Sequence, residues 1–386
     1  MQTISGVHFN FSLPDAVWSL LRTQDNSLLS LQQYKTEGYF KLIRNFRRWL
    51  WVLLYTMGAS PIVSKSFLTG REHSLSPLPN DNDFFYLPHA TSLRMGDLGY
   101  QSTAQDELFV CYNNLSSYIS TLRDALLEPY PSYQAHGLAD SKGQRHQLSN
   151  AVLQIENEFY STVRPKQTAE SGETQLKALL ERGVEYVEVR CLDINPFDPL
   201  GIDATQINFL EVFLLTCLFD ESPESGIEEH QRLANNQKTI VTRGREPDLQ
   251  LETAQGDQGL ADCATILFEK MRHTASTLNS LVPDERYTDA TTHYQSMVDD
   301  PSKTPSSRLV REIESSGMNF IEWTSRQSDA FHNALTQYEL DPTTLRLFED
   351  SVTRSHDLQR EADSASAESL EAYLNAYFDQ YQQLHP

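Results

Sequence analysis

Three segments of this chain alternate apolar and polar residues with the period of two that is typical of β-strands. They cover residues 1–14, 151–160 and 184–193. Because successive side chains of a strand point to opposite sides, each segment predicts one face that packs on a core and one polar face. The three apolar faces consist of Val7, Phe9, Phe11, Leu153, Ile155, Phe159, Val187, Val189 and Cys191. The pattern therefore predicts a sheet that is packed on one side.

The polar faces of these strands carry ionisable and amide side chains, and none of them is lysine. In chain order they are Gln2, Gly6, His8, Asn10, Gln154, Glu156, Glu158, Tyr160, Tyr186, Glu188 and Arg190. A face that simply contacts water is one interpretation, since an antiparallel sheet often packs on one side alone. A functional surface is the other, because His8 with Glu188 can hold a divalent cation and Arg190 can bind a phosphoryl oxygen. Composition alone leaves both interpretations open.

Longer stretches repeat apolar residues at helical spacing. The predicted helices cover residues 14–21, 36–57, 115–127, 174–182 and 204–219, and helical segments continue to the tail at 341–383. Gly58 and Gly183 end two of these helices, and Asp203 is the N-cap of another. In the helix at 36–57, the spacing of the basic residues Lys41, Arg44 and Arg48 predicts a stripe that faces solvent.

Turn-forming residues interrupt these elements at 69–83, 128–147 and 244–259. The strands lie in the first half of the chain and helices dominate the second. We therefore expect a catalytic sheet region at 1–220 and a mainly helical region at 221–386, both in one domain.

Composition argues against several classes of protein and of binding site. The net charge of −22 argues against a nucleic-acid-binding surface, which needs clustered positive charge. The four cysteines, Cys111, Cys191, Cys217 and Cys263, are too widely spaced to indicate a disulfide framework or a zinc site. The longest apolar run, 49–57, is about half of the roughly 20 residues that span a membrane. Residues 2–10 lack the basic and apolar regions of a signal peptide, so we expect a cytoplasmic protein.

Four motifs resemble those of glutamate–cysteine ligases of the gammaproteobacterial type. They are MQTISGVHFNFSLP at 1–14, ATSLRMGDLGY at 90–100, QIENEFY at 154–160 and EYVEVRCLDINP at 185–196. The resemblance is specific over about residues 1–220. It implies an α+β, glutamine-synthetase-like carboxylate–amine ligase fold, with a curved antiparallel sheet surrounded by helices. It also implies ATP-dependent ligation of glutamate, through a γ-glutamyl phosphate, to the amine of cysteine, the first step of glutathione biosynthesis.

The resemblance also implies roles for individual residues. The metal ligands for Mg²⁺ or Mn²⁺ would be His8 and Glu188, and Arg190 and Arg94 would act on the transferring phosphoryl group or the glutamate carboxylates. The substrate contacts would be Gln2, Tyr100 and Tyr160 for cysteine, and Thr3 and Ile4 for glutamate. From their position beside a polar loop, Lys166 and Arg164 are candidate contacts to the ATP phosphates.

Two departures from the family pattern lead to further expectations. Cys191 stands where serine is usual, and we expect no effect because it points to the core. The family also has a long segment ahead of the first motif that completes its metal sites, so we expect the present chain to be inactive or weak.

Two alternatives stay open: a non-catalytic paralogue that acts as an interaction protein, and a ligase of this fold for another amine. We expect a monomer.

Overall fold

The computed structural model describes residues 5–79, 81–98, 103–105, 108–364 and 369–386. Its strands are β1 (Gly6–Phe11), β2 (Ile62–Ser64), β3 (Ser76–Leu78), β4 (Asp81–Tyr86), β5 (Val163–Lys166), β6 (Tyr186–Asp193), β7 (Gln250–Thr253) and β8 (Gly256–Gly259). They form three antiparallel sheets, with the orders β1-β6-β5, β2-β4-β3 and β7-β8.

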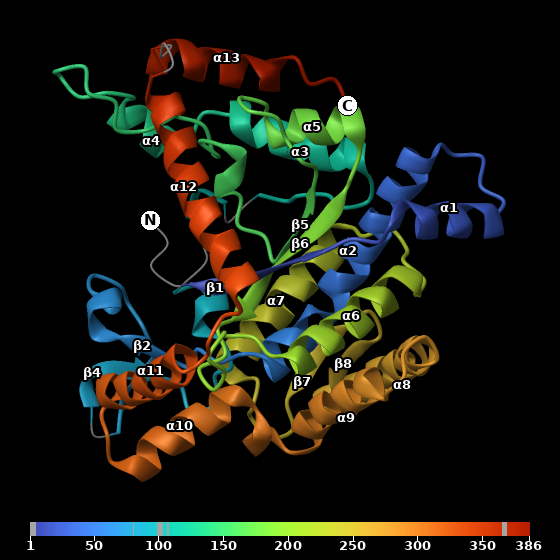
Figure 1. Cartoon of the computed structure of the whole chain (residues 1–386), viewed down its shortest axis with the longest axis vertical. Helices are drawn as coiled ribbons and strands as arrows, with labels where there is room; N and C mark the ends of the chain where they lie inside the picture. The colour runs from blue at the N-terminus through green and yellow to red at the C-terminus, as the bar shows by residue number, and fades with distance from the viewer. Residues whose placement is uncertain (1–4, 80, 99–102, 106–107, 365–368) are drawn as a thin grey trace.

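Helices make up most of the remaining described structure (Figure 1). They are α1 (Asp15–Gln24), α2 (Leu31–Thr56), α3 (Leu115–Leu127), α4 (Pro131–His136), α5 (Gln175–Arg182), α6 (Ala204–Phe219), α7 (Ile227–Arg243), α8 (Leu260–Asn279), α9 (Arg286–Asp299), α10 (Pro305–Ser316), α11 (Phe320–Thr336), α12 (Pro342–Ser364) and α13 (Leu370–Gln382). Small antiparallel sheets with many helices confirm the α+β prediction.

The sheet β1-β6-β5 lies at the centre of the molecule with α2 behind it (Figure 1). Val187 and Val189 of β6 are fully buried and belong to the same core as the apolar face of α2. The helix begins earlier than its apolar pattern predicts, because Ser30 and Gln33 form a capping box that satisfies backbone groups at its first turn. This packing leaves the other face of the sheet available for polar side chains.

Helix α6 packs against α2 from the side away from the sheet and is in turn covered by α8 and α9. It is apolar on nearly all sides, as expected for a helix enclosed by other helices. Its Asp203 cap and its last residue, Phe219, agree with the sequence prediction. Helix α12 is the opposite case, because none of its residues is buried. Figure 1 shows it running from α13 at the top down toward β1.

The strand predicted at 151–160 is wrong. Its backbone turns through a short 3-10 helix, Glu156–Glu158, and the third strand of the sheet is β5 instead. The cause is Glu156, whose buried carboxylate accepts hydrogen bonds from the backbone N–H groups of Gln175 and Leu176 at the start of α5. The first N–H groups of a helix have no partner within the helix, so this carboxylate holds the segment to α5.

The prediction of a solvent-facing basic stripe on α2 is also wrong. Arg44 donates to the carbonyl oxygens of Tyr112 and Asn113. Arg48 binds both carboxylate oxygens of Glu229 on α7, at 2.8 and 3.0 Å. These side chains join α2 to neighbouring segments, because long cationic side chains can bury their stems and keep their charge paired. The predicted loops at 69–83 and 128–147 contain the short elements β3 and α4.

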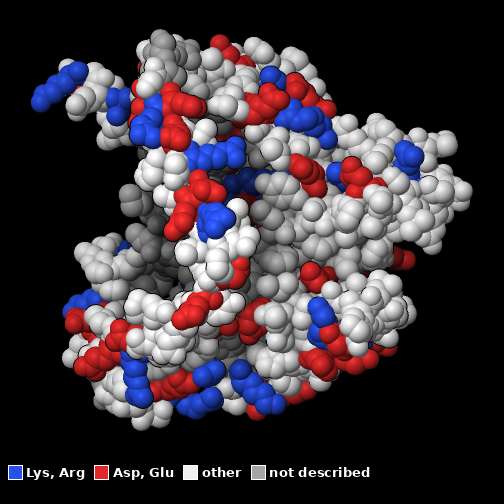
Figure 2. All heavy atoms as spheres, in the orientation of Figure 1, with Lys and Arg blue, Asp and Glu red and all other residues white. Residues whose placement is uncertain are grey.

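On the face drawn in Figure 2, acidic and basic side chains lie in small mixed groups rather than in one broad basic area. In the parts of the chain that the structure describes, no helix has the length and apolar character needed to cross a bilayer.

Truncating the buried ring of Phe213 tests the packing of α6 on α2. Its ring lies 5.6 Å from that of Phe46 on α2, and both side chains are fully buried. Phe213→Ala is expected to lower the free energy of unfolding by about 3–5 kcal/mol, because the cavity cannot fully close. Urea denaturation followed by circular dichroism measures this loss. The control is Phe219→Ala on the same helix, where the ring is 56% exposed and a loss below about 1 kcal/mol is expected.

Candidate active site

The polar face of the central sheet collects charged side chains around one carboxylate, that of Glu188 in β6. Arg190 donates to Glu188 Oε2 at 2.8 Å, and Lys166 Nζ lies 4.0 Å from the same oxygen. His8 Nδ1 of β1 lies 3.6 Å from Glu188 Oε1. Residues from three strands meet here because β6 is the middle strand, with β1 and β5 paired on either side.

The neighbouring cations hold Glu188 in its ionised form. Burial alone would raise the pKa of this carboxyl, but the hydrogen bond from Arg190 and the charges of Lys166 and Arg190 outweigh burial and lower it. Burial lowers the pKa of Lys166, and Glu188 opposes that effect. Opposite charges close together favour their ionised forms, so the carboxylate of Glu188 remains charged at neutral pH.

Arg164 adds a third cation behind this cluster. It lies opposite Glu188 in the pairing of β5 with β6, and its side chain is only 6% exposed. Its guanidinium donates to the carbonyl oxygens of Asn157 and Phe159, so it braces the turn before β5. Burial and the charge of Arg190 lower its pKa, but arginine stays protonated at physiological pH. The buried carboxylate of Glu156 also interacts with Lys166 and Arg164. Among these described groups, three cations still exceed two carboxylates, which suits an anionic substrate.

His8 and Glu188 are chemically suitable as two ligands of a divalent cation. Burial and the charge of Arg190 lower the pKa of His8, so its imidazole is neutral and has a lone pair to offer. Within the described ranges, no group of three His, Cys, Asp or Glu side chains is placed to hold a metal ion. Two protein ligands fit Mg²⁺, which usually keeps water and substrate oxygens in its coordination shell.

Arg94 occupies a different position from the other site residues, because it lies under the end of the sheet. Its side chain is 1% exposed, and its Nε donates to Asp193 Oδ1 at 2.8 Å. Its Nη2 donates to the carbonyl oxygens of Leu192 and Arg190, at 2.8 and 3.2 Å. Among the described residues it therefore contacts the backbone that carries Arg190 rather than the open face of the sheet.

Asp193 is a residue that the sequence reasoning missed. Its two carboxylate oxygens also accept hydrogen bonds from the backbone N–H of Ala59 and from the hydroxyl groups of Ser60 and Ser92. One signal was present: Asp193 continues the apolar face of its strand, and a carboxylate at such a position must be paired. The position of Arg94 in its pair with Asp193 also explains why residue 6 is glycine, because a Cβ at Gly6 would lie 2.6 Å from Arg94 Cζ.

Cys191 faces the core as predicted from the strand pattern. It is 2% exposed, and burial raises the pKa of its thiol to about 12. A thiol that stays protonated is a poor nucleophile, so Cys191 takes part in packing.

Tyr160 lines a cavity of about 500 Å³ beside the start of β5. Its backbone N–H donates to Gln105 Oε1 at 3.0 Å, and the side-chain amide of Gln105 donates to the carbonyl of Glu158 at 2.8 Å. Gln105 therefore fixes the backbone next to Tyr160. The other predicted substrate contacts, Gln2, Thr3, Ile4 and Tyr100, lie outside the described residues.

Comparisons with known proteins agree with this geometry. Residues 1–240 match the family model described as glutamate-cysteine ligase. Glutamate–cysteine ligase of Saccharophagus degradans is 45% identical over 383 residues, which cover 99% of this chain and 72% of that protein. Its counterpart in Hahella chejuensis is 43% identical over 98% of this chain and 72% of its own length.

Two solved structures are similar. The crystal structure of glutamate–cysteine ligase from Francisella tularensis in complex with AMP has a TM-score of 0.89 and 34% identity, covering 98% of this chain and 73% of that one. A bifunctional glutathione synthetase from Pasteurella multocida has a TM-score of 0.61 at 21% identity, covering 84% of this chain and 36% of that one, and so supports the fold alone. By sequence and by structure, this chain belongs to the glutamate–cysteine ligase family.

Proposed function

We propose that this chain joins the γ-carboxylate of L-glutamate to the amine of L-cysteine, with conversion of ATP to ADP and phosphate. The observation that carries the proposal is the group of cations around Glu188 on the open face of the sheet. Such a group favours a polyanionic substrate against the net charge of −22 of the whole chain. The names of the relatives and the AMP bound to the Francisella protein support the same reaction and an adenine nucleotide as co-substrate.

In the first step, an oxygen of the glutamate γ-carboxylate attacks the terminal phosphorus of ATP. A new P–O bond forms, the bond to the oxygen of ADP breaks, and γ-glutamyl phosphate results. Arg190 and Lys166 stabilise the negative charge on the oxygens of the transferring group, because their positions are held by Glu188 before substrate binds. A Mg²⁺ or Mn²⁺ ion held by His8 and Glu188 would neutralise part of the phosphate charge.

In the second step, the amine of cysteine attacks the carbonyl carbon of γ-glutamyl phosphate. The C–N bond forms, the C–O bond to phosphate breaks, and the nitrogen loses a proton. The acyl phosphate must be kept from water, so the amine has to be held beside it. The cavity lined by Tyr160 lies at the start of β5, where its lining residue Thr162 bonds the backbone of Arg190, and we assign the acceptor to it. Contacts from Gln2 and Tyr100 to cysteine, and from Thr3 and Ile4 to glutamate, remain predictions, as does the cytoplasmic monomer.

The activity is tested by incubating the purified chain with ATP, Mg²⁺, L-glutamate and L-cysteine. We expect weak formation of γ-glutamylcysteine, identified by mass spectrometry, with one phosphate released for each molecule formed. Leaving out each substrate in turn is the control. Turnover with another amine but not with cysteine would show that cysteine is not the acceptor. The absence of product with every amine tested would contradict a catalytic role for this chain.

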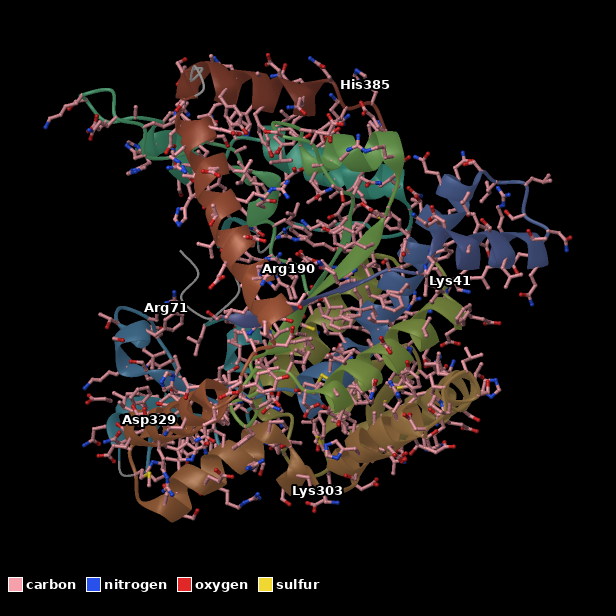
Figure 3. All side chains as sticks on the ribbon, in the orientation of Figure 1. Lys41, Arg71, Arg190, Lys303, Asp329 and His385 are labelled. Carbon is pink, nitrogen blue, oxygen red and sulfur yellow. The ribbon has the colours of Figure 1, made fainter. Side chains whose placement is uncertain are left out.

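Substitution of the central charges tests the proposed roles of Glu188 and Arg190. Glu188→Gln and Arg190→Gln are each expected to lower kcat by about 10²–10³-fold, because the first removes the carboxylate that positions the cations and the second removes a cation that stabilises the transferring group. Lys41→Gln on α2 is the matched control, because it also removes one charge. Figure 3 shows Lys41 at the right of the molecule and Arg190 at its centre. Unchanged kcat in both site variants would contradict the assignment.

A further prediction concerns Arg94 as a positioning residue. Asp193→Asn removes the carboxylate that pairs with Arg94, and a buried charge without its partner is expected to cost about 3–5 kcal/mol of unfolding free energy. The double variant Arg94→Met with Asp193→Leu removes both charges and is expected to recover part of this loss. Urea denaturation measures stability, and the double variant should regain activity in step with stability. Recovered stability without activity would show that Arg94 acts on substrate directly.

The control for this pair is Asp220→Asn. Asp220 forms a partly exposed ion pair with Lys270, whose side chain is 41% exposed. Exposed pairs contribute at most about 1 kcal/mol, so little change is expected.

A further inference from the structure

The cavity lined by Tyr160 also contacts two side chains that the proposed mechanism does not use, Arg47 of α2 and His230 of α7. Arg47 Nη2 lies 2.8 Å from His230 Nδ1, and the Arg47 guanidinium carbon lies 4.8 Å from the centre of the Tyr112 ring. Arginine only donates hydrogen bonds, so Nδ1 of His230 must accept and Nε2 must carry the ring proton. Burial and the charge of Arg47 lower the pKa of His230 to about 4, so the ring is neutral at physiological pH.

The positive charge of Arg47 is not balanced by the described side chains around it. Of the other charged residues that line the cavity, Asp97 and Lys238 pair with each other at 2.9 Å. Glu229, which precedes His230, is bound through both oxygens to Arg48. Within the described residues, no carboxylate oxygen lies within 4.0 Å of the Arg47 guanidinium. A partly buried charge that lacks a counter-ion favours binding of an anion.

Donors on both side chains remain available. Apart from the bond to Nδ1, the N–H groups of Arg47 make no hydrogen bond to a described residue, and neither does Nε2 of His230. None of these atoms is among the fully enclosed polar atoms of the described structure that lack a partner, and both residues line the cavity. A guanidinium with free N–H groups matches the geometry of a carboxylate, and the neighbouring imidazole N–H is a further donor.

The rest of the cavity suits an organic molecule rather than a small inorganic ion. Leu50, Leu108, Val110 and Phe159 supply the apolar part of its mixed lining, and its volume is about 500 Å³. Pockets of this size hold a whole small ligand. Thr162 also lines the cavity, and its carbonyl accepts a hydrogen bond at 2.9 Å from the backbone N–H of Arg190. The cavity is therefore adjacent to the strand that carries the proposed reaction centre.

We propose that Arg47 and His230 form a carboxylate-binding subsite for an amino acid or short peptide whose other end reaches the polar face of the sheet. The carboxylate accepts hydrogen bonds from Arg47 and from His230 Nε2, and the apolar lining contacts the remainder of the ligand. This inference rests on the proposed ligase function. The carboxylate has two sources in that reaction, the acceptor L-cysteine and the product γ-glutamylcysteine.

The test compares each carboxylate with its amide. KM and kcat are measured for L-cysteine and L-cysteinamide, and calorimetry without ATP gives Kd for these two molecules, for γ-glutamylcysteine and for its C-terminal amide. The wild-type chain is expected to favour the carboxylate over the amide by about tenfold or more in at least one pair. Arg47→Gln should abolish this preference, whereas Arg47→Lys should retain part of it. Lys41→Gln is the control on the same helix and should preserve it.

The pattern of outcomes identifies the source. A preference that appears in the KM of cysteine, with kcat unchanged by Arg47→Gln, assigns the subsite to the acceptor. A preference that appears only in Kd for the dipeptide assigns it to the product. The subsite is refuted if the wild-type chain shows no preference, or if folded Arg47→Gln, checked by thermal unfolding, keeps it. If the wild-type chain makes no product, the proposed function fails, and the calorimetric comparison still decides whether Arg47 binds a carboxylate.

Discussion

The buried ion pair between Arg94 and Asp193 is the constraint on which the arrangement of the site depends. Asp193 ends the central strand β6, and its carboxylate also binds the segment after α2 through Ala59 and Ser60. Arg94 binds the backbone of the same strand at Arg190 and Leu192. A buried pair of this kind is stable only when both partners and their remaining hydrogen bonds are present. The strand that carries Glu188 and Arg190 is thereby tied to segments that are distant in the sequence.

The two faces of the central sheet have different roles. On the rear face of the sheet, Val187 and Val189 pack into the same core as α2, and this packing fixes the position of the strands. In front, burial and the neighbouring cations lower the pKa values of Lys166 and Arg164, and the charge of Glu188 opposes that lowering. The rigid back holds these charges in place before any substrate arrives. Preorganised charge of this kind stabilises a transferring phosphoryl group without reorganisation during the reaction.

Much of the fold could be predicted where a local pattern and a local cap agree. The helix at Ala204–Phe219 is such a case, because Asp203 caps an uninterrupted apolar segment. The strand Tyr186–Asp193 is another, because its alternation reflects burial on one side only. The strand predicted at 151–160 failed because Glu156 binds the first turn of α5, a contact between segments that are separated in the chain. Alternation alone cannot reveal that a carboxylate has such a partner.

The residues of the candidate site also divide into those that a local pattern predicts and those that only packing reveals. The sequence by itself determined that His8, Glu188 and Arg190 occupy the polar faces of strands, since side-chain direction follows from a period of two. Their motifs also sufficed to indicate the ligase family. Only the tertiary structure decided that Lys166 joins them, that Arg94 lies beneath the sheet, and that Arg47 meets His230 at a cavity. These facts depend on strand pairing and helix packing between residues far apart in the chain, and no local pattern encodes such distances.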